Sequence, residues 1–255
     1  MRSAYSVAGE GPALFLIHGI GARRATFDRL VEGLSDRFTC ISYDLRGHGL
    51  SPLPAGQFGL DDLVDDLEEL RARLGIGQAH FAGHSLGGMI GPRYALRYPD
   101  RVLSLGLWST AAFRTEDDSA KVMGVVKLMR EKGIGPVLDT LTARWFTDAF
   151  CAARPDVIDW RKKQVMDTDA DVFLNVFDIY AETEMAPWLH QVTAPSQIIT
   201  GELDGGCNPR LNAEIHKALP GSELVILDGL KHAIFIEATE VVLPHVRQFL
   251  LAQGG

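Results

Sequence analysis

Ser85 lies at the centre of the pentapeptide 83–87 (GHSLG), which has the pattern G-x-S-x-G. A short apolar run, Ala79–Gly83, leads into it and is typical of a buried strand, and the apolar stretch Met89–Tyr98 that follows is typical of a helix. A serine on a strand-to-helix turn is exposed at the sheet edge, and its small neighbours give the strained backbone room. We therefore predict that Ser85 is a nucleophile that attacks carbonyl groups.

The base that activates such a serine is expected to be His232. A serine hydroxyl is a weak nucleophile at neutral pH and needs a neighbouring base. Where G-x-S-x-G forms a nucleophile turn, an acid and then a histidine follow the serine along the chain. Of the eight histidines, four follow Ser85: His190, His216, His232 and His245. Only His232 lies in a loop directly after a predicted strand, Glu223–Leu227, where the carboxyl edge of a sheet presents its side chains.

The acid that orients this histidine is expected to be Asp204. It stands in the segment 201–206 (GELDGG), directly after the predicted strand Ser196–Thr200 and one strand before the histidine loop. An aspartate there holds the imidazole and stabilises its charged form. Glu202 and Asp178 are alternatives, and an Asp-Gly pair is also common in plain turns. Asp178 lies within a helical pattern, which disfavours it.

Acyl transfer also needs hydrogen-bond donors for the oxygen that becomes negatively charged. One donor is expected to be the backbone amide of Leu86, the residue after the nucleophile. The second is expected in the loop 18–21 (HGIG), after the first central strand, and we predict that it is the amide of Ile20.

The polar loop 44–51 (DLRGHGLS) is interpreted as structural, with Asp44 and Arg46 bonding to neighbouring backbone. His48 is only a weak candidate for a metal ligand, because no second ligand stands at a suitable spacing. The sequence contains neither a phosphate-binding G-x-x-x-x-G-K-[ST] motif nor a G-x-G-x-x-G motif at the start of a helix. The pattern therefore implies no cofactor and no metal.

The elements that must position these residues alternate between short strands and helices. The predicted strands are 13–18, 38–43, 79–83, 102–108, 196–200 and 223–227. The predicted helices are 27–34, with Thr26 as its cap, 60–74, 89–98, 211–219 and 240–251. Such alternation predicts the α/β class, a mostly parallel sheet with helices on both faces. Pro92 either lies in the first turn of its helix or kinks it.

From about residue 119 to 184 only helical patterns occur: 120–131, 136–146, 157–166 and 170–183. We interpret residues 111–189 as a helical lid inserted into a core formed by residues 1–110 and 190–255. No glycine-rich linker separates the lid from the core, so we expect the lid to pack on the core. Trp145, Phe146, Met123, Phe173 and Trp188 are candidates for the wall of a substrate pocket, although each also fits packing within the lid. Arg23 or Arg144 could bind a substrate carboxylate in a bidentate manner.

Composition excludes several classes. With 255 residues, 46% of them hydrophobic, the chain can form a sizeable core. The net charge of −8, without any cluster of basic residues, argues against a nucleic-acid partner. No apolar run approaches the length of a membrane span, no signal peptide is recognisable, and three dispersed cysteines do not form a disulfide framework. We expect a cytoplasmic protein with a small-molecule substrate; the sequence does not indicate its oligomeric state.

Together these motifs resemble the α/β-hydrolase superfamily over nearly the whole chain. They are 18–21 (HGIG), 44–51 (DLRGHGLS), 83–88 (GHSLGG), 201–204 (GELD) and 231–237 (KHAIFIE), in the family's order. The segment 144–147 (RWFT) is similar to the 3-oxoadipate enol-lactonase branch. That resemblance implies hydrolysis of a small, carboxylate-bearing ester or lactone formed during aromatic catabolism, through an acyl-enzyme.

The sequence departs from that branch at three places. It starts at roughly the second strand of the usual pattern, Lys231 replaces a small residue before the histidine, and Cys207 and Asn208 stand in the acid loop. These departures bear on the identity of the predicted substrate more than on the predicted chemistry. Related branches cleave amides or C–C bonds of ring-cleavage products with the same triad, and other relatives bind a ligand without catalysis. These alternatives stay open.

Overall fold

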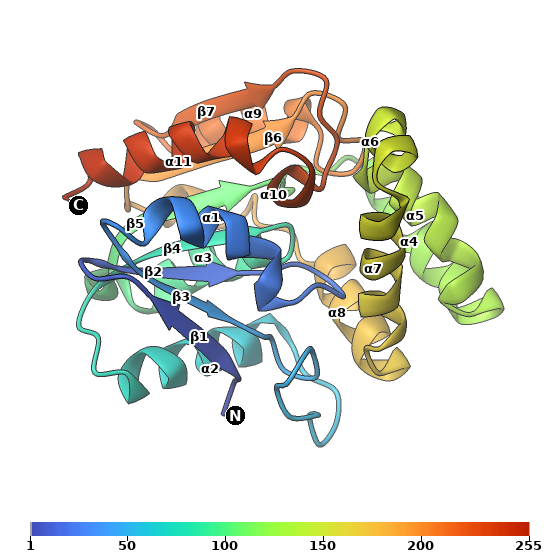
Figure 1. The fold of residues 1–255 in the computed structure, drawn as a ribbon, viewed down its shortest axis with the longest axis horizontal. Coiled ribbons are helices and arrows are strands. Elements are labelled where there is room, and N and C mark those ends of the chain that lie inside the picture. The colour runs from blue at the N-terminus through green and yellow to red at the C-terminus, as the bar shows by residue number, and fades with distance from the viewer. Residues whose placement is uncertain (1, 255) are drawn as a thin grey trace.

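A sheet of seven strands forms the centre of the protein in a computed structural model that describes residues 2–254 (Figure 1). The strand order is β1-β3-β2-β4-β5-β6-β7, and only β1 runs antiparallel to its neighbour. The strands are β1 (Tyr5–Ala8), β2 (Ala13–Ile17), β3 (Thr39–Tyr43), β4 (Ala79–His84), β5 (Val102–Trp108), β6 (Ser196–Gly201) and β7 (Glu223–Leu227). The predicted α/β class with a mostly parallel sheet is confirmed.

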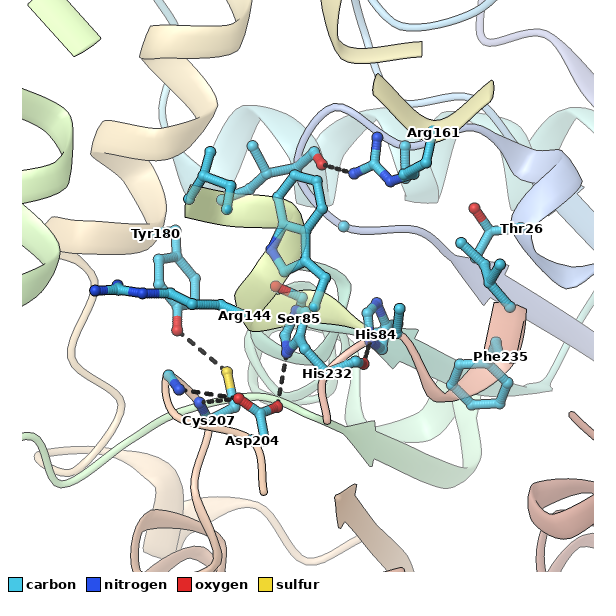
Figure 2. A pocket seen from close by; sticks show the side chains of 18 of the residues that line it. Thr26, His84, Ser85, Arg144, Arg161, Tyr180, Asp204, Cys207, His232 and Phe235 are labelled. Carbon is cyan, nitrogen blue, oxygen red and sulfur yellow. Dashed lines mark hydrogen bonds and ion pairs between the residues drawn. The ribbon is translucent and has the colours of Figure 1, made fainter. Parts of the chain in front are cut away.

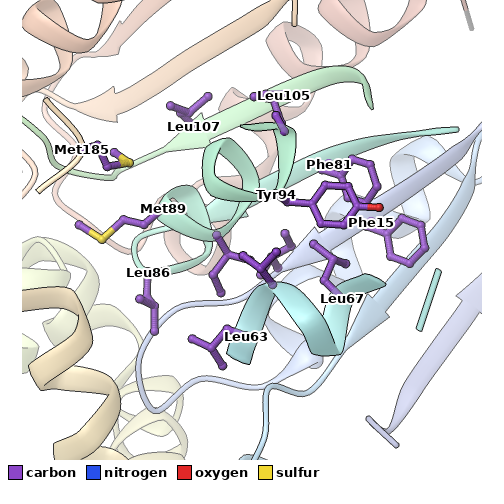
Figure 3. Close-up of a cluster of buried hydrophobic side chains, with 14 of the residues drawn as sticks. Phe15, Leu63, Leu67, Phe81, Leu86, Met89, Tyr94, Leu105, Leu107 and Met185 are labelled. Carbon is purple, nitrogen blue, oxygen red and sulfur yellow. The ribbon is translucent and has the colours of Figure 1, made fainter. Parts of the chain in front are cut away.

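Helices cover both faces of this sheet, so its central strands are buried on both sides. Along β2, Leu14 and Leu16 contact one hydrophobic cluster, whereas Phe15 and Ile17 contact the other. The first cluster lies under α1 (Asp28–Leu34) and α11 (Thr239–Ala252). The second lies under α2 (Leu60–Arg73), α3 (Gly87–Arg97) and α9 (Pro209–Ala218), and Figure 3 shows part of it. This packing fixes the strand ends that carry the candidate site.

The second cluster reaches the turn after β4. Leu86 and Met89 are fully buried in it beside Leu63 of α2 (Figure 3). Because a fully buried leucine or methionine stabilises the fold by roughly 2–3 kcal/mol, the turn that carries Ser85 is anchored by the core itself.

Five helices separate β5 from β6 and lie beyond the carboxyl ends of the central strands (Figure 1). They are α4 (Glu116–Lys132), α5 (Leu138–Trp145), α6 (Asp148–Ala153), α7 (Pro155–Met166) and α8 (Ala170–Glu182). They share a hydrophobic cluster of their own, which includes Met129, Leu141 and Phe173. Val172 and Val176 of α8 also belong to the second cluster, the one under α2, α3 and α9. This helical segment therefore packs on the core.

The structure differs from the sequence-based expectations at several elements. Residues 5–8 form strand β1, which was not predicted. Thr26 does not cap a helix: it lies in a short 3₁₀ turn, Arg24–Phe27, and α1 begins after it without a side-chain cap. Pro92 lies inside α3, beyond its first turn. Helices α6 and α10 (Ile234–Glu237) were not predicted.

Among residues 2–254, no helix is long and apolar enough to span a membrane.

Candidate functional site

Ser85 lies in a left-handed turn between β4 and α3, with a φ angle of 57°. This conformation is strained for any residue with a side chain, and such strain concentrates at functional sites. The turn is held from both sides: the amide of Ser85 donates to the carbonyl oxygen of Trp108 (2.8 Å), and the hydroxyl of Thr110 donates to that of Ser85 (2.9 Å). The backbone thus fixes the direction in which the serine side chain leaves the sheet.

The glycines on either side of Ser85 are required for this turn. A Cβ atom on Gly83 would lie 2.0 Å from the carbonyl oxygen of Gly87, and one on Gly87 would lie 2.1 Å from that of Ile17. Neither backbone oxygen can give way without moving a strand or the helix. The G-x-S-x-G pattern therefore has a steric cause in this fold.

Asp204 and His232 form a partly buried hydrogen bond at the same edge of the sheet. His232 Nδ1 donates to Asp204 Oδ2 over 2.7 Å, and the Asp204 side chain is only 2% exposed. The other oxygen, Asp204 Oδ1, accepts from the amides of Gly206 (2.9 Å) and Cys207 (2.8 Å). His84 Nε2 donates to the backbone carbonyl oxygen of His232 (2.8 Å), which fixes the histidine loop.

The rival acids are held elsewhere. Glu202 accepts a bond from the amide of Gly229, and Asp178 forms an ion pair with Arg130. Of the three acids considered from the sequence, the fold brings only Asp204 to His232.

The pKa of His232 rises and the pKa of Asp204 falls, because each partner stabilises the charged form of the other. Burial alone would lower the pKa of His232, but the carboxylate of Asp204 outweighs it and raises this pKa to about 10. Burial alone would raise the pKa of Asp204, but the charge of His232 and the two backbone amides hold it below its usual value. The arrangement favours a charged imidazolium, the form that develops when a histidine takes a proton.

A cavity of about 130 Å³ opens onto these residues (Figure 2). Ser85, Asp204 and His232 all line it, as does Gly19 in the loop after β2. The wall opposite the sheet comes from the helical segment, with Val122 and Val125 of α4, Leu141, Arg144 and Trp145 of α5, Arg161 of α7, and Phe177 and Tyr180 of α8. Apolar side chains dominate this wall, which is typical of small-molecule sites.

The two amides expected to act as oxyanion donors lie at this cavity or beside it. Ile20 lines it, and Leu86 directly follows Ser85. Within the described residues 2–254, neither amide donates to another protein group. Gly19 lies so close to the serine that a Cβ atom on it would be 2.9 Å from Ser85 Cβ. Gly19, which precedes Ile20, and Leu86, which follows Ser85, thus both adjoin the candidate nucleophile.

Two buried histidines hold the backbone of this loop. His18 Nδ1 donates to the carbonyl oxygen of Gly19 (2.8 Å), and His48 Nε2 accepts from the amide of Gly21 (3.1 Å). The second nitrogens are also used: His18 Nε2 accepts from the amide of Leu45, and His48 Nδ1 donates to the carbonyl oxygen of Arg46. Burial is the chief reason that the pKa of each falls to about 3, so both stay neutral.

His48 thus bonds to the protein backbone, in line with the structural interpretation of the loop 44–51. In the same loop, Asp44 accepts from the amides of Arg24 (2.8 Å) and Leu50 (3.1 Å), so its predicted structural role is confirmed. Arg46 also bonds to backbone, at the carbonyl oxygen of Asp62, and pairs with Asp66.

Of the residues expected to contact a substrate, Trp145 and Arg144 line the cavity. Phe146 does not: it is fully buried in a small cluster and stacks on Phe150. Arg23 does not line it either, because its guanidinium bonds to the carbonyl oxygen of Gln164 and the hydroxyl of Thr168. Met123, Phe173 and Trp188 also lie outside the cavity lining.

Arg161 lines the cavity and was missed by the sequence reasoning. It is 6% exposed, its guanidinium lies 4.6 Å from the centre of the Trp145 ring, and burial lowers its pKa to about 9. In the described part of the chain it forms no ion pair with a carboxylate. The segment 160–163 (WRKK) looks like an exposed basic helix face, so only the packing of α7 distinguishes Arg161 from its neighbours.

The chain is similar to known hydrolases in both sequence and fold. Residues 12–132 match the sequence family described as alpha/beta hydrolase fold. The 3-oxoadipate enol-lactonase 2 of Acinetobacter baylyi is 29% identical over 202 residues, which are 78% of this chain and 75% of that protein. The 2-(acetamidomethylene)succinate hydrolase of Mesorhizobium japonicum is 43% identical over 97 residues, or 38% of this chain and 35% of that protein.

A solved structure shows the same likeness over the whole chain. The crystal structure of the enol-lactonase from Burkholderia xenovorans LB400 superposes with a TM-score of 0.90 at 26% identity, covering 98% of this chain and 96% of that one. The chain has the α/β-hydrolase fold, and among the proteins that share this fold it resembles the 3-oxoadipate enol-lactonases.

Proposed function

We propose that this protein is a serine hydrolase in which Ser85, His232 and Asp204 act together on a carbonyl carbon. The observation that carries the proposal is the 2.7 Å hydrogen bond between His232 and the buried Asp204, at the wall of the cavity that Ser85 also lines. A serine needs a base, and the base needs a third group that orients it. The strained turn at Ser85 and the hydrolase names of the relatives add support.

In the first half of the reaction, Ser85 Oγ attacks the carbonyl carbon while His232 takes the hydroxyl proton. Asp204 keeps the imidazole oriented and stabilises its positive charge. The amides of Ile20 and Leu86 donate to the oxygen that becomes negative, each contributing on the order of 3 kcal/mol. When the intermediate collapses, His232 gives its proton to the leaving oxygen, and the acyl group stays on Ser85.

Water completes the cycle. His232 takes a proton from a water molecule, which attacks the acyl carbon, and the same two amides stabilise the second oxyanion. Collapse of this intermediate breaks the bond to Ser85 Oγ. The proton on His232 returns to Ser85, and the carboxylic acid leaves.

The proposed substrate is a small carboxylic ester or enol-lactone that itself bears a carboxylate. A cavity of about 130 Å³ holds a small molecule, and two arginines, Arg144 and Arg161, line it. Oxoadipate and succinate, in the names of two relatives, are carboxylates. An arginine fork matches a carboxylate group in geometry and charge. The resemblance to enol-lactonases suggests a role in the catabolism of aromatic compounds.

Residues 111–189 act, in this proposal, as a lid over a core formed by residues 1–110 and 190–255. Helices α4, α5, α7 and α8 supply most of the cavity wall opposite Ser85. The lid therefore selects the substrate, whereas the loops at the sheet edge carry out the chemistry.

Cleavage of an amide is a second candidate activity. One relative, 43% identical over 97 residues, is named as a hydrolase of 2-(acetamidomethylene)succinate. The same triad can attack an amide carbonyl, and related branches cleave C–C bonds.

A substrate panel separates these activities: an enol-lactone, a p-nitrophenyl ester, a formamide and a vinylogous diketone, each with and without a carboxylate. We expect the ester and lactone with a carboxylate to be cleaved about 100-fold faster than the formamide and diketone. The Ser85→Ala variant is the blank for every substrate. A preference for the formamide or the diketone would replace the ester assignment, and binding of all four without turnover would identify a non-catalytic ligand-binding protein.

A further inference from the structure

Cys207 is a buried thiol beside the acid–base pair, and the proposed mechanism does not use it. It is 1% exposed and forms no disulfide. Its Sγ atom lies 3.2 Å from the hydroxyl of Tyr180, and its amide donates to Asp204 Oδ1. Figure 2 shows the thiol, the carboxylate and the imidazole gathered at one end of the cavity.

Asp204, Cys207 and His232 offer a carboxylate oxygen, a sulfur and an imidazole nitrogen within 4.8 Å of one another. These are the three ligand types of protein-bound zinc, at metal–ligand distances of about 2.0–2.3 Å. In tetrahedral geometry such distances place ligand atoms roughly 3.5 Å apart, so small side-chain rotations close the site. All three residues line the cavity, through which an ion can reach them.

The loop that carries the thiol is held in place. The carbonyl oxygen of Cys207 accepts from the hydroxyl of Thr200 (2.7 Å) and from the side-chain amide of Asn212 (2.8 Å). Outer contacts of this kind orient ligands and reduce the cost of ordering them when a metal binds.

We propose that Asp204, Cys207 and His232 form a binding site for a zinc-like divalent cation, and that an ion in this site switches hydrolysis off. On binding, Cys207 loses its thiol proton and coordinates as the thiolate, and the His232 imidazolium also releases one proton, both to solvent. A ring nitrogen of the resulting neutral His232 and an oxygen of Asp204 then complete three positions. Hydrolysis stops because the imidazole and the carboxylate that serve Ser85 become metal ligands. This effect on activity rests on the proposed function, whereas binding of the ion does not.

The thiolate makes the site selective. Sulfur ligands favour zinc, cadmium and cobalt over magnesium and calcium, which prefer all-oxygen sites. Co²⁺ is therefore a suitable probe, because a cobalt–thiolate bond gives a charge-transfer absorption in the near ultraviolet that oxygen and nitrogen ligands alone do not.

The binding test is a Co²⁺ titration of the full-length protein. We expect a saturable thiolate band in the wild type and in Ser85→Ala, displaced by Zn²⁺ and unaffected by Mg²⁺. The band should disappear in Cys207→Ser and persist in Cys151→Ser, which removes the half-buried cysteine of α6. A band that survives in Cys207→Ser, or no band in the wild type, would overturn the proposal.

A measurement on the wild type alone guards against misfolding of the Cys207 variants. X-ray absorption of the zinc-bound protein should show one sulfur at about 2.3 Å with nitrogen and oxygen at about 2.0 Å. Oxygen and nitrogen neighbours without sulfur would contradict the site. Because neither optical nor X-ray absorption depends on turnover, a failure of this site is distinguishable from a failure of the proposed hydrolase activity.

The activity test measures inhibition of ester hydrolysis by Zn²⁺, each variant being compared with its own metal-free rate. We expect inhibition that a chelator reverses, and a concentration for half-inhibition at least about tenfold higher in Cys207→Ser than in the wild type. Equal sensitivity of the two proteins would show that zinc acts elsewhere.

Discussion

Arg161 of α7 donates a hydrogen bond from Nη2 to the backbone carbonyl oxygen of Ile20, over 2.9 Å. Its Nη1 donates to the carbonyl oxygen of Gly21, over 2.6 Å. A residue of the helical segment thus holds the loop that carries one of the two proposed oxyanion donors. Because the donor is a charged group, these bonds are of the stronger kind, about 1.5–3 kcal/mol each. The position of the Ile20 amide therefore depends on the packing of α7.

Replacing Arg161 with glutamine should lower kcat for a neutral p-nitrophenyl ester by about 10- to 100-fold, with a small change in KM. Loss of the two bonds frees the loop, and a misplaced oxyanion donor costs up to about 10²–10³ in rate. A neutral ester removes any contribution from a substrate carboxylate. The matched control is Lys162→Gln, because Lys162 of the same helix pairs with the exposed Asp139 and, among the described residues, forms no hydrogen bond with the loop. Equal rates in the two variants would rule out the positioning role.

Replacing Gly19 with alanine should also reduce activity, through steric contact alone. The added methyl group would lie 2.9 Å from Ser85 Cβ and 3.1 Å from the carbonyl oxygen of His84. Displacement of a nucleophile by even 1 Å can cost about 10² in rate. Gly205→Ala is the control, because a methyl group there meets no atom within 4 Å. We expect a loss of at least about tenfold in kcat for the first variant only, with both proteins folded by circular dichroism.

The pH dependence of kcat/KM should report the raised pKa of His232. A general base works only when neutral, so kcat/KM of the wild type should still rise with pH above 7, with Ser85→Ala as the blank for spontaneous hydrolysis. In Asp204→Asn the carboxylate is absent and burial then lowers this pKa. The rising limb should move to lower pH, and the maximal rate should fall by about 10³–10⁴. If the rising limb of Asp204→Asn stays at the wild-type pH, the pairing with Asp204 is not what raises the pKa of His232.

Acid should destabilise the fold through its buried histidines. The pKa of His48 is about 3 in the folded protein and close to 6.5 in the unfolded chain, so only the unfolded chain gains this proton as pH falls below 6.5. At pH 5 the loss is about 2 kcal/mol for each such histidine. His48→Gln keeps an acceptor near the amide of Gly21 but cannot be protonated.

Urea unfolding at pH 7 and pH 5 tests this effect. The decrease in the free energy of unfolding between the two pH values should be smaller in His48→Gln than in the wild type. The exposed His245→Gln should behave as the wild type does. An identical decrease in His48→Gln would mean that His48 is not kept neutral by burial.

Site residues whose positions are set by the ends of strands could be predicted from the sequence. Asp204 lies in the loop after the buried strand β6, and His232 lies in the loop after the half-buried strand β7. In a parallel sheet those strand ends meet at one edge. Ser85 was recognisable because its flanking glycines are required by backbone contacts that recur wherever a strand turns sharply into a helix. Local sequence and fold thus point to the same residues.

Other features depend on tertiary contacts that no local pattern records. Strand β1 has only four residues, and Tyr5 and Val7 are exposed, so it lacks the apolar run of a buried strand. Arg161 is distinguished from its basic neighbours only by the loop on which α7 packs. Phe146 turns into a cluster of its own rather than toward the cavity, although it is next to Trp145 in sequence.

The central claim, that Ser85 is the nucleophile, is tested most directly by a serine-reactive phosphonate with mass spectrometry of the modified peptides. The account predicts one phosphonate per chain, attached to Ser85, no label in Ser85→Ala, and much slower labelling in His232→Gln. Label on another residue, or a folded wild-type protein that takes no label, would contradict it.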